Sequence, residues 1–215
     1  MAARNPIIRI DVINRLLEAN KDAPFTADSH GWLPLHHAVA SDRLNISLVE
    51  RMLELFKAGC MKPCKEGLTP LHLLVRRHVA RVEDCFMERN GRDMSDLSAL
   101  KEMALECAQV LIRANSKCVR VCDLADRSPL HSAADSFCPD QGFIELLSDM
   151  YGAALKLADK AGELPLHLLL RRLRLPEVAP PELTSQLTAA FGVSLKVALD
   201  FVRLDKETIK VRGPL

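Results

Sequence analysis

Cysteine thiolates and histidine imidazoles are the groups in this sequence most able to act as metal ligands or nucleophiles. Four of the seven cysteines form two Cys-x-x-x-Cys pairs, Cys60 with Cys64 and Cys118 with Cys122, and four thiolates would suffice for zinc. The pairs stand at different distances from the prolines that follow them, 10 and 6 residues before Pro70 but 11 and 7 before Pro129. We therefore expect small buried side chains rather than a metal site, and we predict no cofactor.

An enzyme built on one of these thiols would need a base beside the cysteine and a third group to orient that base. No cysteine stands near a histidine in a motif of this kind. The sequence also contains no Gly-x-Gly-x-x-Gly, no phosphate-binding Gly-Lys-Ser/Thr loop and no His-Glu-x-x-His. We predict a protein that is not an enzyme, and we keep a thiol-dependent or metal-dependent enzyme as an alternative.

The cysteines also bear on the compartment, because they are odd in number and no secretory apolar segment precedes them. This usage indicates reduced thiols in an intracellular protein, with the cytoplasm expected first and the nucleus second. No apolar run approaches the roughly 18 residues that cross a bilayer, since Leu166–Leu170 contains His167 and is followed by two arginines. We therefore expect no membrane insertion.

Four of the seven histidines belong to one recurring phrase: Leu33-Pro34-Leu35-His36, Thr69-Pro70-Leu71-His72, Ser128-Pro129-Leu130-His131 and Leu164-Pro165-Leu166-His167. The prolines are 36, 59 and 36 residues apart, so the middle interval carries 23 additional residues. Because a catalytic or ligating residue is rarely needed four times at regular spacing, we assign these histidines a structural role. The period indicates one helical unit per repeat.

Each phrase has the chemistry of a helix start, since proline at the first helical position loses no hydrogen bond and Thr69 and Ser128 can cap from the position before it. A second helix with an inward apolar stripe is expected over Ile46–Phe56 (Leu48, Val49, Met52, Leu53 and Phe56) and over Phe143–Met150 (Ile144, Leu146, Leu147 and Met150). The segments before the prolines carry turn residues, Asp28, Asp123 and Asp159 six residues ahead and Gly31, Gly67 and Gly162 three residues ahead.

The segments Asp28-Ser-His-Gly-Trp-Leu-Pro-Leu-His-His-Ala and Asp159-Lys-Ala-Gly-Glu-Leu-Pro-Leu-His-Leu-Leu resemble the ankyrin repeat signature over about residues 7 to 191. The resemblance implies an all-α solenoid of helix-turn-helix repeats with short β-hairpin-like fingers. It also implies that the phrase histidine joins the helix start to the finger by hydrogen bonds. The sequence departs from the family at Leu33 and Leu164, which replace the usual Thr, at Asp126 in place of Gly, and at Cys64 in place of Asp.

On this basis we divide the chain into an N-terminal half-repeat cap (1–26), a stack of four units with an insertion near 79–99 (27–203) and a C-terminal tail (204–215). The half-cap begins at Asn5-Pro6, and a last helix is expected from Pro181 to about Phe191, followed by an amphipathic segment over 195–201. The insertion is expected to be either a tolerated surface loop or a partner-specific projection with Phe86 and Met87 exposed. After it, Ser95 or Asp96 is expected to cap a helix from Leu97 to Asn115.

Charge gives no strong indication of a partner, because 29 Lys and Arg balance 28 Asp and Glu, a net charge of +1. Two basic clusters occupy the same place in their units: Arg76-Arg77-His78 with Arg81, and Arg171-Arg172 with Arg174. They are either solvated helix ends or a surface for an acidic partner, and less favourably for phosphates. Aromatic residues make up only 4%, so nucleic acid is not expected.

The resemblance implies passive recognition, in which a scaffold or adaptor binds a partner protein on a concave face, and we expect no small-molecule substrate. The family's contact positions fall on Ser29, His30, Trp32, His37, Lys65, Glu66, Leu68, Leu73, Leu124, Ala125, Arg127, Ser132, Lys160, Ala161, Glu163 and Leu168. Trp32 is either an exposed anchor or packs on the half-cap. A structural subunit or spacer of a larger assembly is a further alternative.

Overall fold

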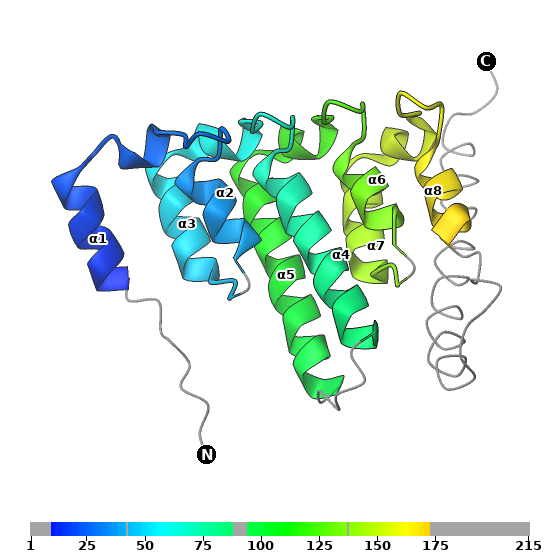
Figure 1. Ribbon diagram of the computed structural model, residues 1–215, viewed down its shortest axis with the longest axis horizontal. Coiled ribbons are helices and arrows are strands. Elements are labelled where there is room, and N and C mark those ends of the chain that lie inside the picture. The colour runs from blue at the N-terminus through cyan, green and yellow to red at the C-terminus, as the bar shows by residue number, and fades with distance from the viewer. Residues whose placement is uncertain (1–9, 42, 88–93, 137, 173–215) are drawn as a thin grey trace.

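The computed structural model of the protein describes residues 10–41, 43–87, 94–136 and 138–172. All the regular secondary structure of these residues is helical, and no strand is found among them. The α-helices are α1 (Ile10–Ala19), α2 (Pro34–Ala40), α3 (Ile46–Leu55), α4 (Pro70–Met87), α5 (Met94–Ala114), α6 (Pro129–Ala134), α7 (Gln141–Met150) and α8 (Pro165–Arg172). Four short 3-10 helices join them: η1 (Ala23–Phe25), η2 (Lys57–Met61), η3 (Ser116–Arg120) and η4 (Gly152–Lys156). The helices stand side by side in a row, and the loops that precede the prolines share one edge (Figure 1).

The prolines of the repeated phrase begin helices α2, α4, α6 and α8, which confirms the predicted helix starts. A second helix follows in three of these units, and a side chain caps the start of two of them, α3 and α7. Asn45 Oδ1 accepts a hydrogen bond of 3.0 Å from Leu48 N at α3, and Asp140 Oδ1 accepts one of 2.9 Å from Gly142 N at α7. Each cap satisfies an amide that the helix cannot pair internally.

The core is one continuous apolar cluster that runs along the whole row. The first helices pack in succession, α2 on α4, α4 on α6 and α6 on α8. The predicted stripes are confirmed at Val49, Met52 and Leu53 of α3 and at Ile144 and Leu147 of α7. The prediction is wrong for Met150, which is exposed because α7 ends there.

The expected insertion loop at 79–99 is wrong for most of its length, because the additional residues lengthen two helices. Helix α4 has 18 residues and α5 has 21, against 7 in α2 and 10 in α3. The apolar spacing of Val79, Val82, Ala104 and Ala108 continues the buried face of the pair, so helix remains the favourable conformation. In Figure 1 both helices, drawn in green, extend well beyond their neighbours.

The details predicted for this segment change accordingly. The expected helix from Leu97 to Asn115 begins earlier, at Met94, so Ser95 and Asp96 lie inside the helix and do not precede it. Phe86 and Met87 are the last residues of α4, and their side chains lie outside the described part of the chain, as do residues 88–93.

The loops before the prolines share one geometry, which confirms the predicted turn chemistry. In three of them an aspartate Oδ1 accepts two backbone hydrogen bonds of 2.8–2.9 Å, from His30 and Trp32 to Asp28, from Ala125 and Arg127 to Asp123, and from Ala161 and Glu163 to Asp159. Gly31, Gly67 and Gly162 have φ between 77° and 79°, and Asp126 takes the same left-handed region at 58°.

Backbone hydrogen bonds also join successive loops. Lys65 N donates to His30 O at 3.0 Å, and Lys160 N donates to Ala125 O at the same distance. Gly67 lies so close to the next loop that a Cβ atom there would be 2.6 Å from Leu124 N, whereas nothing lies within 4 Å of a Cβ at Gly162.

Several sequence predictions fall on residues outside the described ranges: the Asn5-Pro6 start, the helix at 181–191, the segment at 195–201 and the tail at 204–215. Within the described ranges, no helix combines the length and apolar character that crossing a bilayer requires.

We predict that Gly67→Ala destabilises the protein more than Gly162→Ala does. Both substitutions place a Cβ on left-handed backbone, which costs about 1 kcal/mol, but only the first also forces atoms of the Leu124 loop apart. We expect an additional loss of about 1–3 kcal/mol for Gly67→Ala. Urea unfolding followed by circular dichroism measures both, and equal losses would refute the steric argument.

Asp126→Gly should act in the opposite direction. Asp126 is the only non-glycine residue with positive φ in the described part of the chain, and its equivalents in the other loops are glycines. Relief of the Cβ strain should raise the free energy of unfolding by up to about 1 kcal/mol in the same urea experiment. A lower unfolding midpoint would show that the Asp126 side chain contributes more than its backbone strain costs.

Candidate interaction site

The phrase histidines bind backbone groups of two successive units. His72 Nδ1 lies 2.8 Å from Thr69 Oγ1 and accepts a longer bond of 3.4 Å from Thr69 N, and His72 Nε2 lies 3.0 Å from Arg127 O. His36 repeats the arrangement, with Leu33 N at 3.0 Å from Nδ1 and Lys62 O at 3.0 Å from Nε2. Because a backbone N–H can only donate, Nδ1 is the unprotonated nitrogen and Nε2 donates to the carbonyl. The structural role is confirmed for these two histidines.

The other two phrase histidines lack part of this arrangement. His131 Nδ1 is 2.9 Å from Ser128 Oγ, but its buried Nε2 has no hydrogen-bond partner within the described residues. His167 accepts from Leu164 N at 3.0 Å and is exposed. Where leucine replaces threonine, as at Leu33 and Leu164, the imidazole retains the backbone donor and loses only the hydroxyl.

Burial favours the neutral form of three of the four phrase histidines. It lowers the pKa of His36, His72 and His131 below the ordinary value of 6.5, and nearby backbone carbonyls oppose this shift only in part. An imidazole with both nitrogens committed to the backbone, as in His36 and His72, has no free nitrogen for proton transfer.

The thiols are similarly placed in apolar surroundings. Burial raises the pKa of Cys107, Cys118 and Cys138 to about 12, so these thiols are not thiolates at neutral pH. In the described residues no three His, Cys, Asp or Glu side chains are grouped to hold a metal ion. Cys85 lies outside the residues whose side chains are described.

The sixteen predicted contact residues differ in exposure. Ser29, His30, His37, Lys65, Glu66, Leu124, Lys160 and Ala161 are exposed, whereas Trp32, Ala125, Arg127, Ser132 and Glu163 are half-buried. Leu68, Leu73 and Leu168 are buried, so the prediction that they contact a partner is wrong. Their apolar side chains pack inside the protein, which is more favourable than exposure to solvent.

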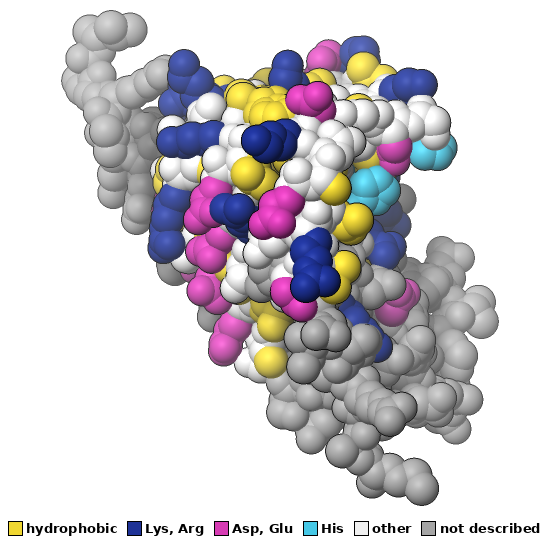
Figure 2. Space-filling model, turned by 90° about the vertical axis from the view of Figure 1, so that its left-hand side faces the viewer, with side chains coloured by type: hydrophobic (Ala, Val, Ile, Leu, Met, Phe, Trp, Pro, Cys, Tyr) yellow, Lys and Arg dark blue, Asp and Glu magenta, His cyan; other side chains and the backbone are white. Residues whose placement is uncertain are grey.

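Trp32 is neither fully exposed, as an anchor for a partner would be, nor fully buried. Its ring is half-buried and packs on the core, with its centroid 5.0 Å from that of His37. His37 Nε2 is 2.9 Å from Asp28 Oδ2. Hydrogen bonds, led by that from Trp32 N, lower the pKa of the Asp28 carboxyl to about 2. At this end of the row acidic and basic side chains are intermixed, and no single sign of charge covers the visible face (Figure 2).

A polar groove lies on the opposite half of the row, between α4, α6, α8 and the loop before α6. We call it the arginine groove, and its charged lining residues are Arg76, Glu83, Asp123, Arg127, Asp135 and Arg172. Between them lie the smaller side chains of Val79, Ala80, Ala125 and Ser132. The groove thus brings together three predicted contact residues, Ala125, Arg127 and Ser132, with first-helix residues of three units.

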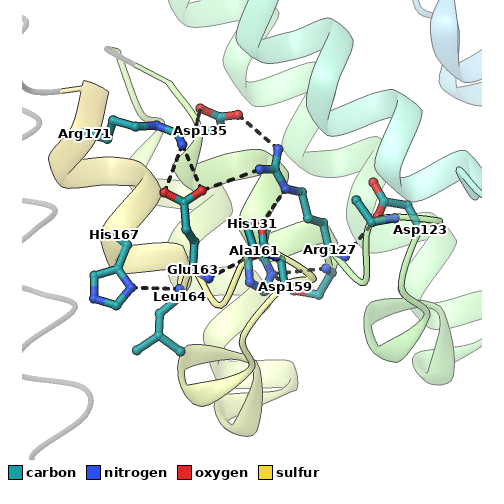
Figure 3. Close-up of polar contacts among 12 residues, drawn as sticks. Asp123, Arg127, His131, Asp135, Asp159, Ala161, Glu163, Leu164, His167 and Arg171 are labelled. Carbon is teal, nitrogen blue, oxygen red and sulfur yellow. Dashed lines mark hydrogen bonds and ion pairs between the residues drawn. The ribbon is translucent and has the colours of Figure 1, made fainter.

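Arg127 organises the charges at this groove (Figure 3). Its Nε donates to Asp159 Oδ2 at 2.9 Å, and its Nη1 and Nη2 lie 3.5 Å from Asp135 and 3.8 Å from Glu163. Burial opposes ionisation of both Arg127 and Asp159. Their mutual contact nevertheless raises the pKa of Arg127, and together with the Glu163 N–H it lowers the pKa of Asp159.

Two arginines of α8 complete the network. Arg171 Nη1 binds both oxygens of Glu163 at 2.8 and 2.9 Å, and Arg172 Nε donates to Asp135 Oδ1 at 2.7 Å. Sequence reasoning missed Glu83 and Asp135 as lining residues. The position of Asp135 was a usable signal, because it stands six residues after its proline, as do Arg76 and Arg171.

The two basic clusters are only partly surface features. Arg77 Nε donates to Ala40 O at 3.1 Å, and His78 is buried with Nε2 3.0 Å from Asp140 Oδ2. Arg77 is nevertheless exposed, whereas the burial of His78 removes it from both surfaces considered for this cluster, the solvated helix end and the surface for an acidic partner. Arg76 and Arg172 do line one groove, and Arg174 lies outside the described residues.

Comparison with known proteins does not assign a family to the chain. No protein-family model matches it, and no curated protein matches it.

We predict that the protein loses stability as the pH falls below 6.5. The pKa values of His36, His72 and His131 are lower in the folded chain than the unfolded value of 6.5, so the unfolded chain binds more protons in this range. Stability is complete above pH 6.5 and is lost progressively as the pH falls through the folded pKa values. At pH 5.5 each histidine should contribute a loss of up to about 1.4 kcal/mol.

His72→Gln tests the origin of this loss, and His167→Gln at the exposed equivalent position is its control. Urea midpoints at pH 7.5 and 5.5 should differ less for His72→Gln than for the unmodified protein, although His72→Gln starts from a lower stability. His167→Gln should retain the original difference. If both variants show the same pH dependence as the unmodified chain, the buried imidazole of His72 is not its source.

Proposed function

We propose that this chain is a non-catalytic protein-interaction module of the ankyrin repeat type, which binds a partner protein at the arginine groove. The proposal of a repeat stack is supported by the phrase that recurs four times and begins a helix each time. It is further supported by the shared geometry of the loops, whose aspartates, left-handed residues and loop-to-loop hydrogen bonds recur from unit to unit.

The observation that carries the proposal is the groove itself. Side chains from first helices of three successive units and from one loop face the same concave space. Stacked repeats present such surfaces for extended partners, and their specificity depends on the residues that vary between units. At one position of the first helix these residues are Arg76, Asp135 and Arg171, so the face carries a distinct charge pattern.

A non-catalytic role is supported by the chemistry of the reactive side chains. The bridging imidazoles are engaged by the backbone, and the buried thiols resist ionisation. An intracellular setting would suit thiols that are free in this structure, namely the six described cysteines. Ion pairs between protein side chains account for the arginines at the network centre without any substrate.

The second candidate is a structural subunit or spacer of a larger assembly. The observation that favours it is at the other end of the row, where Val12, Leu16 and Phe25 are exposed. Apolar side chains gathered at one end of a helical row are suited to contact with another protein.

The groove is tested by filling it. Ala80 is exposed, lines the groove and belongs to α4, so Ala80→Trp should obstruct the groove without removing any ion pair. Ala99, an exposed alanine of α5 that lines none of the described grooves, supplies the control Ala99→Trp. We expect a protein captured from cell extract by the unmodified chain to be captured by Ala99→Trp and lost by Ala80→Trp, with equal helical circular dichroism throughout.

Other outcomes identify other surfaces. Capture by both variants would show that the partner does not use the arginine groove. If only Ala99→Trp loses the captured protein, the binding surface lies on the long α4–α5 pair. If both tryptophan variants capture the protein but Leu16→Glu does not, the structural subunit or spacer is favoured.

A further inference from the structure

The charged side chains of the arginine groove and of the Arg127 network beside it are nearly balanced in number but unequal in exposure. The side chains of Arg171 and Arg172 are each 49% exposed and that of Arg127 is 28% exposed. Their carboxylate partners are covered more deeply, with Glu163 at 26%, Asp135 at 20% and Asp159 at 2%. A partner that approaches the groove therefore meets guanidinium groups before it meets carboxylates.

The carboxylates of the groove are already engaged. Asp135 is contacted by Arg127, Arg171 and Arg172. Asp123 accepts two backbone hydrogen bonds, and Glu83 accepts one of 2.8 Å from Ser136 Oγ. A basic partner would have to displace these contacts in order to bind, which leaves the partly buried Arg127 without some of its counter-charges.

The arginines, by contrast, retain unused donors. Arg76 is exposed and makes no ion pair within the described residues, and the bond that Arg172 gives to Asp135 uses only its Nε. Arginine has five N–H donors in a planar fork that matches a carboxylate. The guanidinium groups of Arg76, from α4, and Arg172, from α8, line the same groove as Asp135.

We infer that the arginine groove binds an acidic segment of the partner protein, with carboxylates of that segment received by Arg76 and Arg172. This inference rests on the proposed function and specifies its partner. Ala80, Ala125 and Val79 line the same groove, and their small side chains leave room for a peptide backbone whose acidic side chains reach the arginines.

Two other ligands fit the groove less well. Its volume of about 280 Å³ lies below the roughly 300–1,000 Å³ of usual small-molecule sites. Nucleic acid binding draws on long basic tracts and aromatic stacking, whereas the chain has a net charge of +1 and 4% aromatic residues. Among the described residues, none that lines this groove is aromatic.

The inference is tested with labelled peptides and the full chain. A fluorescein-labelled peptide of alternating glutamate and serine is titrated with the protein at low ionic strength and followed by fluorescence anisotropy. The matched peptide has lysine in place of glutamate, and a short DNA duplex serves as the phosphate probe. We expect saturable binding of the glutamate peptide alone, weakened by added salt.

Arg76→Gln is the decisive variant, because Arg76 supports no ion pair in the described structure and its loss should leave folding unchanged. Arg113→Gln, at an exposed arginine of α5 outside the arginine groove, is the matched control. The glutamate peptide should bind Arg76→Gln roughly tenfold more weakly, since one charge-assisted hydrogen-bonded contact is lost, and should bind Arg113→Gln as it binds the unmodified chain.

The inference is overturned if the lysine peptide binds more tightly, if both arginine variants weaken binding equally, or if only the DNA duplex binds with sensitivity to Arg76. It is also overturned if no glutamate peptide binds while Ala80→Trp still abolishes partner capture; in that case the groove function stands and its partner is not acidic. If neither peptide binds and Ala80→Trp captures the partner normally, both the inference and the proposed function fail.

Discussion

The bridge made by a single imidazole is the interaction on which the rest of the row depends. In His36 and His72 one ring nitrogen accepts from the start of its own helix, and the other donates to a carbonyl of the following unit. The bond to the helix start is buried and the bond to the carbonyl is partly buried, and an unpaired backbone group is costly in such surroundings. The bridge therefore fixes the distance between a helix start and the next loop, and with it the spacing of the units.

The loops depend on this spacing in turn. An aspartate at the head of each of three loops binds two backbone amides, and a left-handed residue lets the chain turn back to the proline. Where Cys64 replaces that aspartate, the loop keeps the backbone bond from Cys64 N to Leu68 O at 2.9 Å, and its contact with the neighbouring loops holds it in place. A rigid line of loops then sets Arg127 and Asp159 at the distance at which they pair.

Most of the helical arrangement could be predicted from the sequence, because local rules decide it. Proline at a helix start, Asn45 and Asp140 as caps, and glycine at positive φ each depend on a few neighbouring residues.

The features that the sequence did not predict arise from tertiary contact. Spacing alone could not show whether Leu73 contacts a partner, because His37 and Ser132 occupy the same position in their units. Of these three side chains only that of Leu73 is buried, where its apolar surface is removed from water. The spacing of Asp135 from its proline marked its position, but its contacts with Arg127 and with Arg172 of the next unit depend on tertiary packing. The 23 additional residues suggest a loop because they interrupt the repeat period, although the helices on both sides continue to pack on each other.

The lengths of α4 and α5 have a consequence for helical phase. Each is eleven residues longer than its counterpart in the preceding unit, 18 against 7 in α2 and 21 against 10 in α3. Eleven residues are close to three turns of an α-helix at 3.6 residues per turn. Because about three whole turns are added, the apolar face of each helix points in the same direction after the addition as before it, and the long pair continues to pack on its neighbours. The chain can therefore gain length at the edge remote from the loops while the register of the row remains as it would be in a unit of ordinary size. The additional turns of α4 also supply Val79, Ala80 and Glu83 to the arginine groove.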